Sequence, residues 1–151
     1  MAMEQEYIFL KLGDIKGKAT TEKFKDQVVL QNMHYGISQA GQWEEGDHLS
    51  GRITTFSDLS AVKLMDVASP SLATACALKT QYPKAEISVT SGTKDAYYKL
   101  TLENVIVTSI ATSVNAGEAH PTESFTLSFR KGTWEYGTAK GGYDLATNKK
   151  V

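Results

Sequence analysis

The chain has 151 residues, 41% of them hydrophobic and 22% charged, and carries a formal net charge of −1. This composition excludes a disordered chain, and the length fits a single domain, residues 1–151, with a real core. Without a basic excess the chain is not expected to bind nucleic acid, and no stretch approaches the ~20 apolar residues that span a bilayer. Ser and Thr account for 28 residues, many alternating with apolar ones, which favours sheets with one face in water.

The N-terminal part predicts two strands separated by a charged loop. Residues 7–12 form a short apolar strand, and residues 16–25 form a loop in which Gly17 supplies the turn. Between residues 27 and 39 apolar and polar residues alternate, which predicts one long, half-buried strand. The polar face of this strand carries Asn32, His34 and Ser38.

Residues 40–51 are polar, contain three glycines, and are predicted to form a long loop. Loops of about 12 residues without structure of their own are uncommon unless they have a function. Trp43 lies within this segment and needs apolar surface, either on its own domain or on a neighbouring subunit.

The middle of the chain predicts a strand followed by the only helix. Residues 52–65 alternate as a strand does. Ser69 is placed to cap a helix whose first turn accommodates Pro70, because proline needs no amide partner there. Apolar residues then recur at helical spacing to about Thr80, and the dipeptide Tyr82-Pro83 is expected to stop the helix.

The remainder of the chain predicts strands. Residues 86–90 and 98–107 flank a hairpin turn at residues 91–95. The second strand either bends at Glu103-Asn104 or is covered on both faces, since its end is wholly apolar. A shift of phase between residues 124 and 136 indicates a β-bulge at Gly132. Strands at regular intervals with one helix are typical of a small barrel or sandwich.

The sequence offers no constellation for catalysis, metal binding or cofactor binding. His34, His48 and His120 lie in different predicted elements, and none has a partner at metal-ligand spacing. The acidic run Glu44-Glu45 with Asp47 lacks the pattern of a calcium loop. Phosphate-binding glycine motifs and nucleophile elbows are also missing. We therefore expect no catalytic residues, no metal ligands, no cofactor and no enzymatic activity.

Six segments, in order and spacing, match the pattern of a known family. They are Ile8-Phe9-Leu10-Lys11-Leu12 with Ile15-Lys16-Gly17, then Gly36-Ile37-Ser38-Gln39, then residues 58–76 including Asp66-Val67-Ala68-Ser69-Pro70-Ser71-Leu72, then residues 98–107, 121–136 and 143–150. Together they cover nearly the whole chain and resemble the haemolysin-coregulated protein (Hcp) family of the bacterial type VI secretion system. Two loops depart from the pattern: the segment after Gln39 lacks the family's glycine run and carries Trp43, and the segment before Tyr143 is short.

The resemblance implies a small β-barrel with one flanking helix that assembles into a homohexameric ring. Rings would stack into the inner tube, which is propelled with its spike from a contractile sheath and carries small effector proteins in its lumen. The implied partners are further copies of the chain, spike, sheath and baseplate components, and effectors. The implied location is the cytoplasm at synthesis, followed by release through the secretion system. The acidic N-terminal residues, which show no signal-peptide pattern, agree with that route.

A closed ring needs two different, complementary patches on each subunit. The segment 40–51 is the candidate arm toward the next subunit or ring, with Trp43 as its anchor. The candidate interface residues are Gln39, Gln42, Trp43, Glu44, Glu45 and His48, and the candidate lumen residues are Asn32, His34 and Ser38. Alternation alone leaves open whether the latter face the lumen or the outer solvent. The alternative function is a monomeric β-sandwich that binds a carbohydrate or surface ligand, with Trp43 as a stacking platform.

Overall fold

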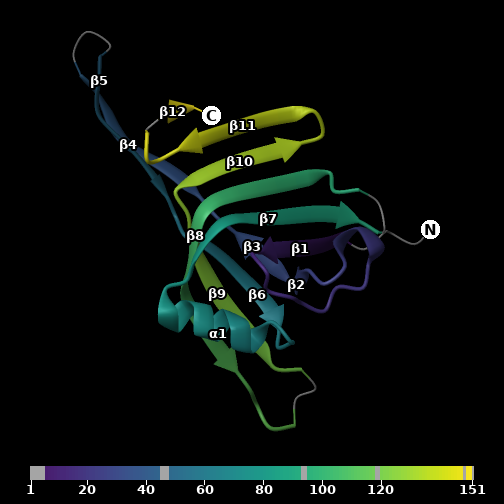
Figure 1. Cartoon of the computed structure of the whole chain (residues 1–151). Coiled ribbons are helices and arrows are strands. Elements are labelled where there is room, and N and C mark those ends of the chain that lie inside the picture. Colours follow the sequence, from purple (N-terminus) through teal and green to yellow (C-terminus); the bar gives the residue numbers. More distant parts are fainter. Residues whose placement is uncertain (1–5, 45–47, 93–94, 118–119, 148, 151) are drawn as a thin grey trace.

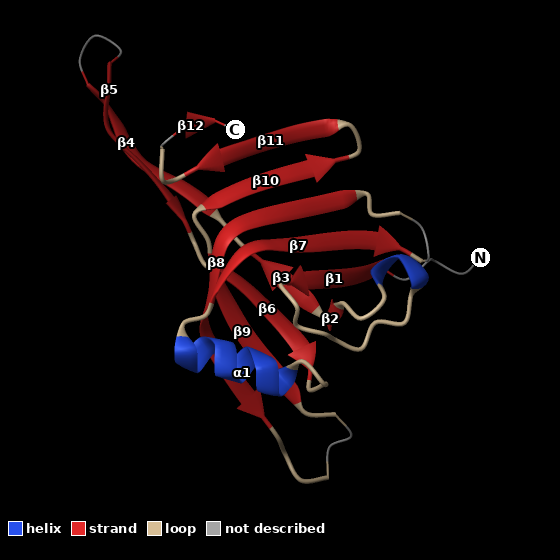
Figure 2. Ribbon diagram, viewed as in Figure 1, coloured by secondary structure: helices blue, strands red, loops and turns tan. Residues whose placement is uncertain are grey.

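The computed structural model (Figure 1) describes residues 6–44, 48–92, 95–117, 120–147 and 149–150, and the side chains in these ranges except those of residues 40–53. In this part of the chain the elements are β1 (Glu6–Leu12), η1 (Glu22–Phe24), β2 (Val28–Leu30), β3 (Asn32–His34), β4 (Ile37–Glu44), β5 (His48–Phe56), β6 (Leu59–Leu64), α1 (Ser69–Leu78), β7 (Gln81–Ser91), β8 (Tyr98–Ser113), β9 (Thr122–Ser128), β10 (Lys131–Tyr136), β11 (Ala139–Asp144) and β12 (Lys149–Lys150). The expectation of a mainly β chain with one α-helix is confirmed (Figure 2).

The main sheet has ten strands and curls around the core. One run of neighbours is β8–β7–β1–β2, and another is β3–β6–β9–β8. Only Gln31 separates β2 from β3, and its amide donates to the carbonyl of Val62 at 2.7 Å. The strand order therefore returns to β8, as in a small barrel. The strands β10, β11 and β12 extend the sheet beyond β8.

The long strand β8 bends between its two partners. Residues 98–103 pair with β10, and residues 106–113 pair with β9. Leu100 and Leu102 point into the core before the bend, and Val105 and Val107 do so after it. Asn104, between them, has a left-handed backbone with φ of 57°. This single residue changes the phase, which confirms the predicted bend at this position.

The expected bulge at Gly132 is wrong. Gly132 pairs regularly with Leu102 of β8 and Tyr143 of β11. The phase changes earlier, where β9 ends and the amide of Arg130 donates to the carbonyl of Glu103 at 3.1 Å. The strands β9 and β10 thus pair with β8 on either side of its bend, and no extra residue is inserted at Gly132.

The single strand expected over residues 27–39 is also wrong, because the chain turns there. It forms β2, β3 and the start of β4. Val28 and Leu30 are buried in the barrel, whereas Ile37 is 46% exposed. Val29 packs in a second apolar cluster on the other side of the sheet. Because β2 is covered on both faces, its apolar residues do not alternate with polar ones. The period-two pattern therefore assigned Val29 to the core side of the strand, whereas Val28 and Leu30 face the core of the barrel.

The long loop expected over residues 40–51 is in fact most of a hairpin. The strands β4 and β5 form a separate antiparallel sheet, with a register shift between Ala40 and Gln42. Within the described chain, the two strands of this hairpin pair only with each other. We call this hairpin the arm; Figure 1 shows it projecting away from the body of the barrel.

The helix α1 has ten residues and packs against β8. Pro70 lies in the first turn as expected, but the capping residue is Ala68 and not Ser69. The helix ends before Lys79, which has a left-handed φ of 51°, and the dipeptide Tyr82-Pro83 belongs to β7 instead of stopping the helix. No described helix has the length and apolar character that crossing a membrane requires.

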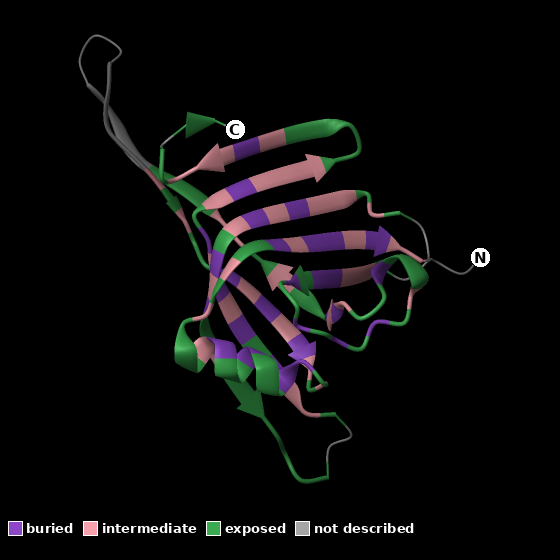
Figure 3. Ribbon diagram, in the orientation of Figure 1, coloured by how far each residue is buried: buried purple, intermediate pink, exposed green. Residues whose placement is uncertain are grey.

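The core consists of two apolar clusters on opposite sides of β1. The larger fills the barrel and includes Leu72 of α1. The smaller joins Phe9 of β1 to Phe24 of η1, whose rings stack with centroids 4.6 Å apart. The segment between β1 and β2 thus forms a lid over β1. Figure 3 shows the resulting alternation of buried and less buried residues along the strands.

Gly17 fixes this lid by close approach of two backbones. Its amide donates to the carbonyl of Asp26 at 2.8 Å, and a Cβ at this position would lie 2.5 Å from both Gln27 O and Val28 Cα. Backbone atoms cannot yield as a flexible side chain does. We therefore expect Gly17→Ala to lower the free energy of unfolding by about 1–3 kcal/mol, measured by urea denaturation. The exposed neighbour Lys18, changed to Ala, is the control, and equal effects of both changes would contradict this role.

Candidate assembly surfaces

The described contacts between the arm and the barrel lie at the base of the arm. The Ser57 Oγ accepts from the amide of Gly36 at 2.7 Å, and the Ser57 amide donates to the Gly36 carbonyl at 2.9 Å. Phe56 stacks on Phe129 with ring centroids 5.0 Å apart and makes a T-shaped contact with Tyr143 with centroids 6.2 Å apart. These contacts fix the direction of the arm, because all of them lie where its two strands leave the body.

A pair of tyrosines braces the same region from inside the barrel. The hydroxyls of Tyr35 and Tyr98 are 2.5 Å apart, which links the start of the arm to β8. Burial, followed by this hydrogen bond, raises the pKa of Tyr98 far above its usual value. The raised pKa favours the protonated form of the Tyr98 hydroxyl, which suits its place in this hydrogen bond.

The structure brings most of the predicted interface residues together at the outer part of the arm. Gln42 and Trp43 lie on β4 opposite Ser50 and Leu49, and Glu44 pairs with His48. Gln39 lies nearer the base and is exposed. Glu45, and the side chains of the other residues from 40 to 53, lie outside the described part of the structure.

Two of the three predicted lumen residues lie on one polar sheet face. Direct cross-strand partners share a face of an antiparallel pair, and His34 is paired with Ser60, which is paired with Thr126. We call this surface the hydroxyl face. Its hydroxyl residues are Ser60, Thr108, Ser109, Ser113, Thr122, Ser124, Thr126 and Ser128; Asn32 and His34 adjoin them on β3, and Val62, Leu64, Ile106 and Ala111 complete it. Ser38 lies on the arm opposite Thr55, away from this face.

The hydroxyl groups of this face bond to one another. Thr108 is an extra residue between the paired Val107 and Ser109, so β8 carries a bulge there. Its hydroxyl donates to Oδ2 of Asp58 at 2.8 Å and lies 2.6 Å from the Thr126 hydroxyl. The Ser109 hydroxyl is also 2.6 Å from that of Thr126. The Ser and Thr alternation of residues 124–128 was a sequence signal for this face, but its neighbours on β6 and β8 were not identified from the sequence.

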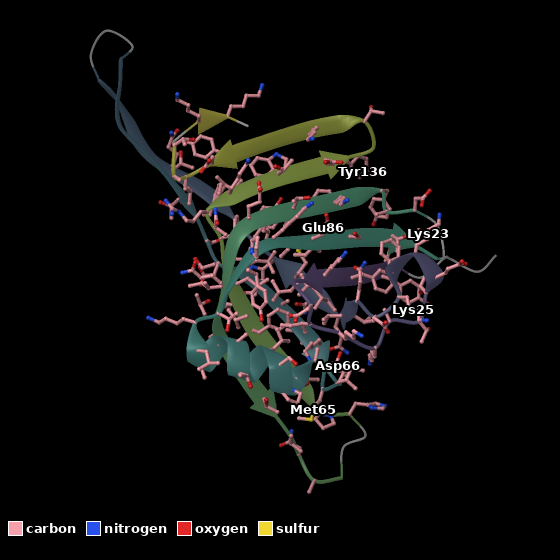
Figure 4. The ribbon with its side chains drawn as sticks, viewed as in Figure 1. Lys23, Lys25, Met65, Asp66, Glu86 and Tyr136 are labelled. Atoms are coloured by element: carbon pink, nitrogen blue, oxygen red, sulfur yellow. The ribbon has the colours of Figure 1, made fainter. Side chains whose placement is uncertain are left out.

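The outer face of the other half of the sheet is charged. One cross-strand row alternates in sign over five strands: Lys84, Glu103, Lys131, Asp144 and Lys149. Ion pairs on this charged face include Lys131 with Glu103 at 3.2 Å and Lys84 with Glu86 at 2.9 Å, and Glu86 is labelled in Figure 4. Such alternation satisfies each charge locally and leaves little net field.

A fully buried lysine joins β6, α1 and β9. The Lys63 side chain is 0% exposed, and its Nζ lies 2.8 Å from Oε2 of Glu123 and 2.9 Å from Oδ1 of Asp66. It also donates to Ser69 Oγ at 2.9 Å, and Ser69 Oγ accepts from the Asp66 amide at 3.0 Å. Ser69 therefore serves this cluster instead of capping the helix. Figure 4 shows Asp66 at the N-terminal end of α1.

The environment of Glu123 favours its ionised form. Burial by itself raises the pKa of Glu123, but hydrogen bonds from Lys63, Ser69 and Thr112 and the charge of Lys63 outweigh it, and the pKa is lower than usual. A carboxyl with a lowered pKa in the folded state stabilises the fold above its ordinary pKa of 4.5. That stabilisation is lost as the pH falls through the lower folded value.

We therefore expect the free energy of unfolding to fall as the pH drops below 4.5 and the Glu123→Gln variant to show a shallower fall. Urea denaturation at a series of pH values measures both slopes. The control is Glu135→Gln, whose carboxylate lies on the surface 3.8 Å from Lys140 Nζ. Identical pH profiles for the wild type and Glu123→Gln would contradict the assignment.

The described residues contain no group of three or more His, Cys, Asp or Glu side chains that could hold a metal ion. His34 and His120 are both exposed and belong to separate parts of the chain. The side chain of His48 and the residues Glu45 and Asp47 lie outside the described part.

Known proteins are similar to this chain in fold and in sequence. Residues 9–136 match the family described as "Type VI secretion system effector, Hcp". Protein hcp1 of Pseudomonas aeruginosa is 29% identical over 132 residues, which are 85% of this chain and 82% of that protein. The crystal structure of Hcp1 from Salmonella typhimurium has a TM-score of 0.85 at 29% identity, over 97% of this chain and 99% of that one. A structure of a type six secretion system protein has a TM-score of 0.87 at 25% identity, over 99% and 100%.

These likenesses, with the barrel, the arm and the two contrasting faces, define the class of protein: a structural component of the type VI secretion system and not an enzyme. The chain belongs to the Hcp family, the secreted tube proteins of that system. The family resemblance of the six sequence segments is thereby confirmed.

Proposed function

We propose that the chain forms a hexameric ring, that rings stack into the inner tube of the secretion system, and that the lumen carries small effector proteins. Its partners are then further copies of itself, effectors, and the spike, sheath and baseplate components. It is made in the cytoplasm and is released through the type VI secretion system. The observation that carries the proposal is an arm whose two strands, among the described residues, pair only with each other.

The arm needs a neighbour to be stable. An isolated two-stranded hairpin is at best marginally stable in water. Within the described chain, β4 and β5 pair only with each other, and contacts with the barrel are confined to the base around Tyr35, Phe56 and Ser57. A second copy of the chain, in the same ring or the next, would supply the missing surface.

Two free strand edges suit a ring. In the described chain, β3 pairs only with β6, and residues 109–113 of β8 pair only with β9. These edges lie at opposite ends of the four-stranded run β3–β6–β9–β8. Exposed edges readily pair with another strand, and two different edges on one subunit allow head-to-tail association that closes as a ring.

Such a ring would place the hydroxyl face on its inner wall. The opposite side of the same strands is covered by the core and by α1. A ring has less room at its inner radius than at its outer radius, so the bulk of each subunit fits outside. Asn32 and His34 would then face the lumen. In the alternative arrangement, the same face lies on the outside of the ring and both residues face the surrounding solvent.

Size-exclusion chromatography with light scattering tests the ring. We expect a particle of six times the 16.5 kDa chain mass, and longer tubes at high concentration by electron microscopy. A strictly monomeric particle at every concentration would overturn the ring and favour the monomeric ligand-binding module, with Trp43 as its stacking platform.

A further inference from the structure

The hydroxyl face carries no formal charge of its own. The chain has 16 basic and 17 acidic residues, yet the face contains none of them on β3, β6, β9 or residues 106–113 of β8. The two charged residues of these strands, Lys63 and Glu123, both point into the core. Asp58 borders the face just before β6, and its Oδ2 accepts from Thr108.

The other half of the sheet shows that this absence is not a general property of the surface. Its outer face carries the alternating row from Lys84 to Lys149 and several ion pairs. Both faces belong to one continuous ten-stranded sheet. Charge is therefore distributed by face, and the hydroxyl face has the chemistry of neutral donors and acceptors.

Ser and Thr hydroxyls can bond to every polar group of a protein. Each hydroxyl donates one hydrogen bond and accepts others, so carboxylates, ammonium groups and amides are all suitable partners. A neutral wall also exerts no long-range attraction or repulsion on a charged molecule. Because Thr108, Ser109 and Thr126 already bond to one another, each contact with a further partner is weak, and holding depends on repetition around the ring.

We propose that the hydroxyl face holds small protein cargo of either net charge through uncharged contacts, chiefly hydrogen bonds. This inference rests on the ring proposed above. The occupant is a polar protein surface, acidic or basic, and the wall does not select between them. Charge matching would require fixed charges on the wall, and the described face has none. Association is accordingly insensitive to salt.

Three peptides of equal length, labelled with an uncharged fluorophore, provide the test: one Ser/Asn/Gly-based, one with added Lys and one with added Glu. Fluorescence anisotropy with the hexameric ring should give dissociation constants that agree within about threefold. They should also change less than threefold between 0.1 M and 1 M NaCl, over which the screening length falls from about 10 Å to about 3 Å.

The variant Thr126→Lys places one cation per subunit on the wall and should favour the Glu peptide over the Lys peptide by about tenfold or more at low salt. The control Thr133→Lys adds the same charge to the charged face, since Thr133 lies there opposite Thr101, and should leave the three affinities equal. If Thr126→Lys does not form rings, Ser124→Lys, at an exposed position on the same face, replaces it.

Strong preference of the wild-type ring for one charge, loss of binding in high salt, or no peptide binding by an intact hexamer would each overturn this inference. None of these three results contradicts the proposed ring, because light scattering on the same samples measures assembly independently. A chain that is monomeric in those samples would instead overturn the proposed function.

Discussion

Replacing Lys63 with Met is expected to lower the free energy of unfolding by about 3–5 kcal/mol. Met fills a similar volume, so the loss is electrostatic: the change leaves Glu123 and Asp66 without the ammonium group that lies 2.8 and 2.9 Å from them. Neither carboxylate can recover water, because their side chains are only 3% and 2% exposed. Urea denaturation at pH 7 and one fixed protein concentration measures the effect.

The matched control is Lys131→Met, which removes an ion pair of 3.2 Å to Glu103 on the charged face. Both partners there are in contact with water, and the expected change is within about 1 kcal/mol. The triple variant Lys63→Met, Asp66→Asn, Glu123→Gln should recover part of the loss, because no buried charge then remains unpaired. Equal effects of the two Lys→Met changes would contradict the role given to Lys63.

The buried cluster around Lys63 was partly predictable from the sequence. Lys63 follows Leu59 and Ala61 in phase on β6, so the pattern already places it on the core side. Its partner Glu123 is directly opposite on β9, in phase with Phe125. Two opposite charges in phase with core residues are a signal of a buried pair. Which acidic residue pairs with which basic residue depends on the register between strands that are far apart in sequence. The alternation of apolar and polar residues within one strand does not determine that register.

The strands of the barrel were predictable where one face is apolar and the other wet, as in β9 and the first part of β8. The errors have a common physical cause. β2 is covered on both faces, so its run of apolar residues has no period. The sequence of the arm is polar and rich in glycine, so it resembles that of a loop. Its two strands form through backbone pairing with each other.

The polar faces were only half predictable for a related reason. The sequence identifies Asn32 and His34 as residues of a wet strand face. The structure pairs His34 with Ser60 and Asn32 with Val62, whose partners on β9 are Thr126 and Ser124. Assignment of that face to a lumen requires the ring. The six family segments supplied the ring as an expectation, because no single residue pattern encodes an assembly.

Removing the arm is expected to abolish stable assembly and leave the subunit folded. Ser38 and Thr55 are direct partners at its base, so replacing residues 39–54 by Asn-Gly gives a two-residue hairpin turn of a favoured type. The anchoring contacts of Phe56 and Ser57 remain in place. The free energy of unfolding of the monomer should therefore change by no more than about 1 kcal/mol, whereas light scattering should show dissociation at concentrations at which the intact chain is a ring.

Trp43→Ala tests the proposed anchor within the arm. If Trp43 buries its ring against another copy, its loss should weaken assembly at least about tenfold, equivalent to about 1.4 kcal/mol, with unchanged unfolding of the monomer. The matched control is Tyr136→Ala on β10, an aromatic residue that is 65% exposed and far from the arm along the sheet (Figure 4). Rings and tubes of the truncated chain that match those of the intact chain would exclude the arm from assembly. Normal assembly of Trp43→Ala alone would restrict the contact to the other residues of the arm.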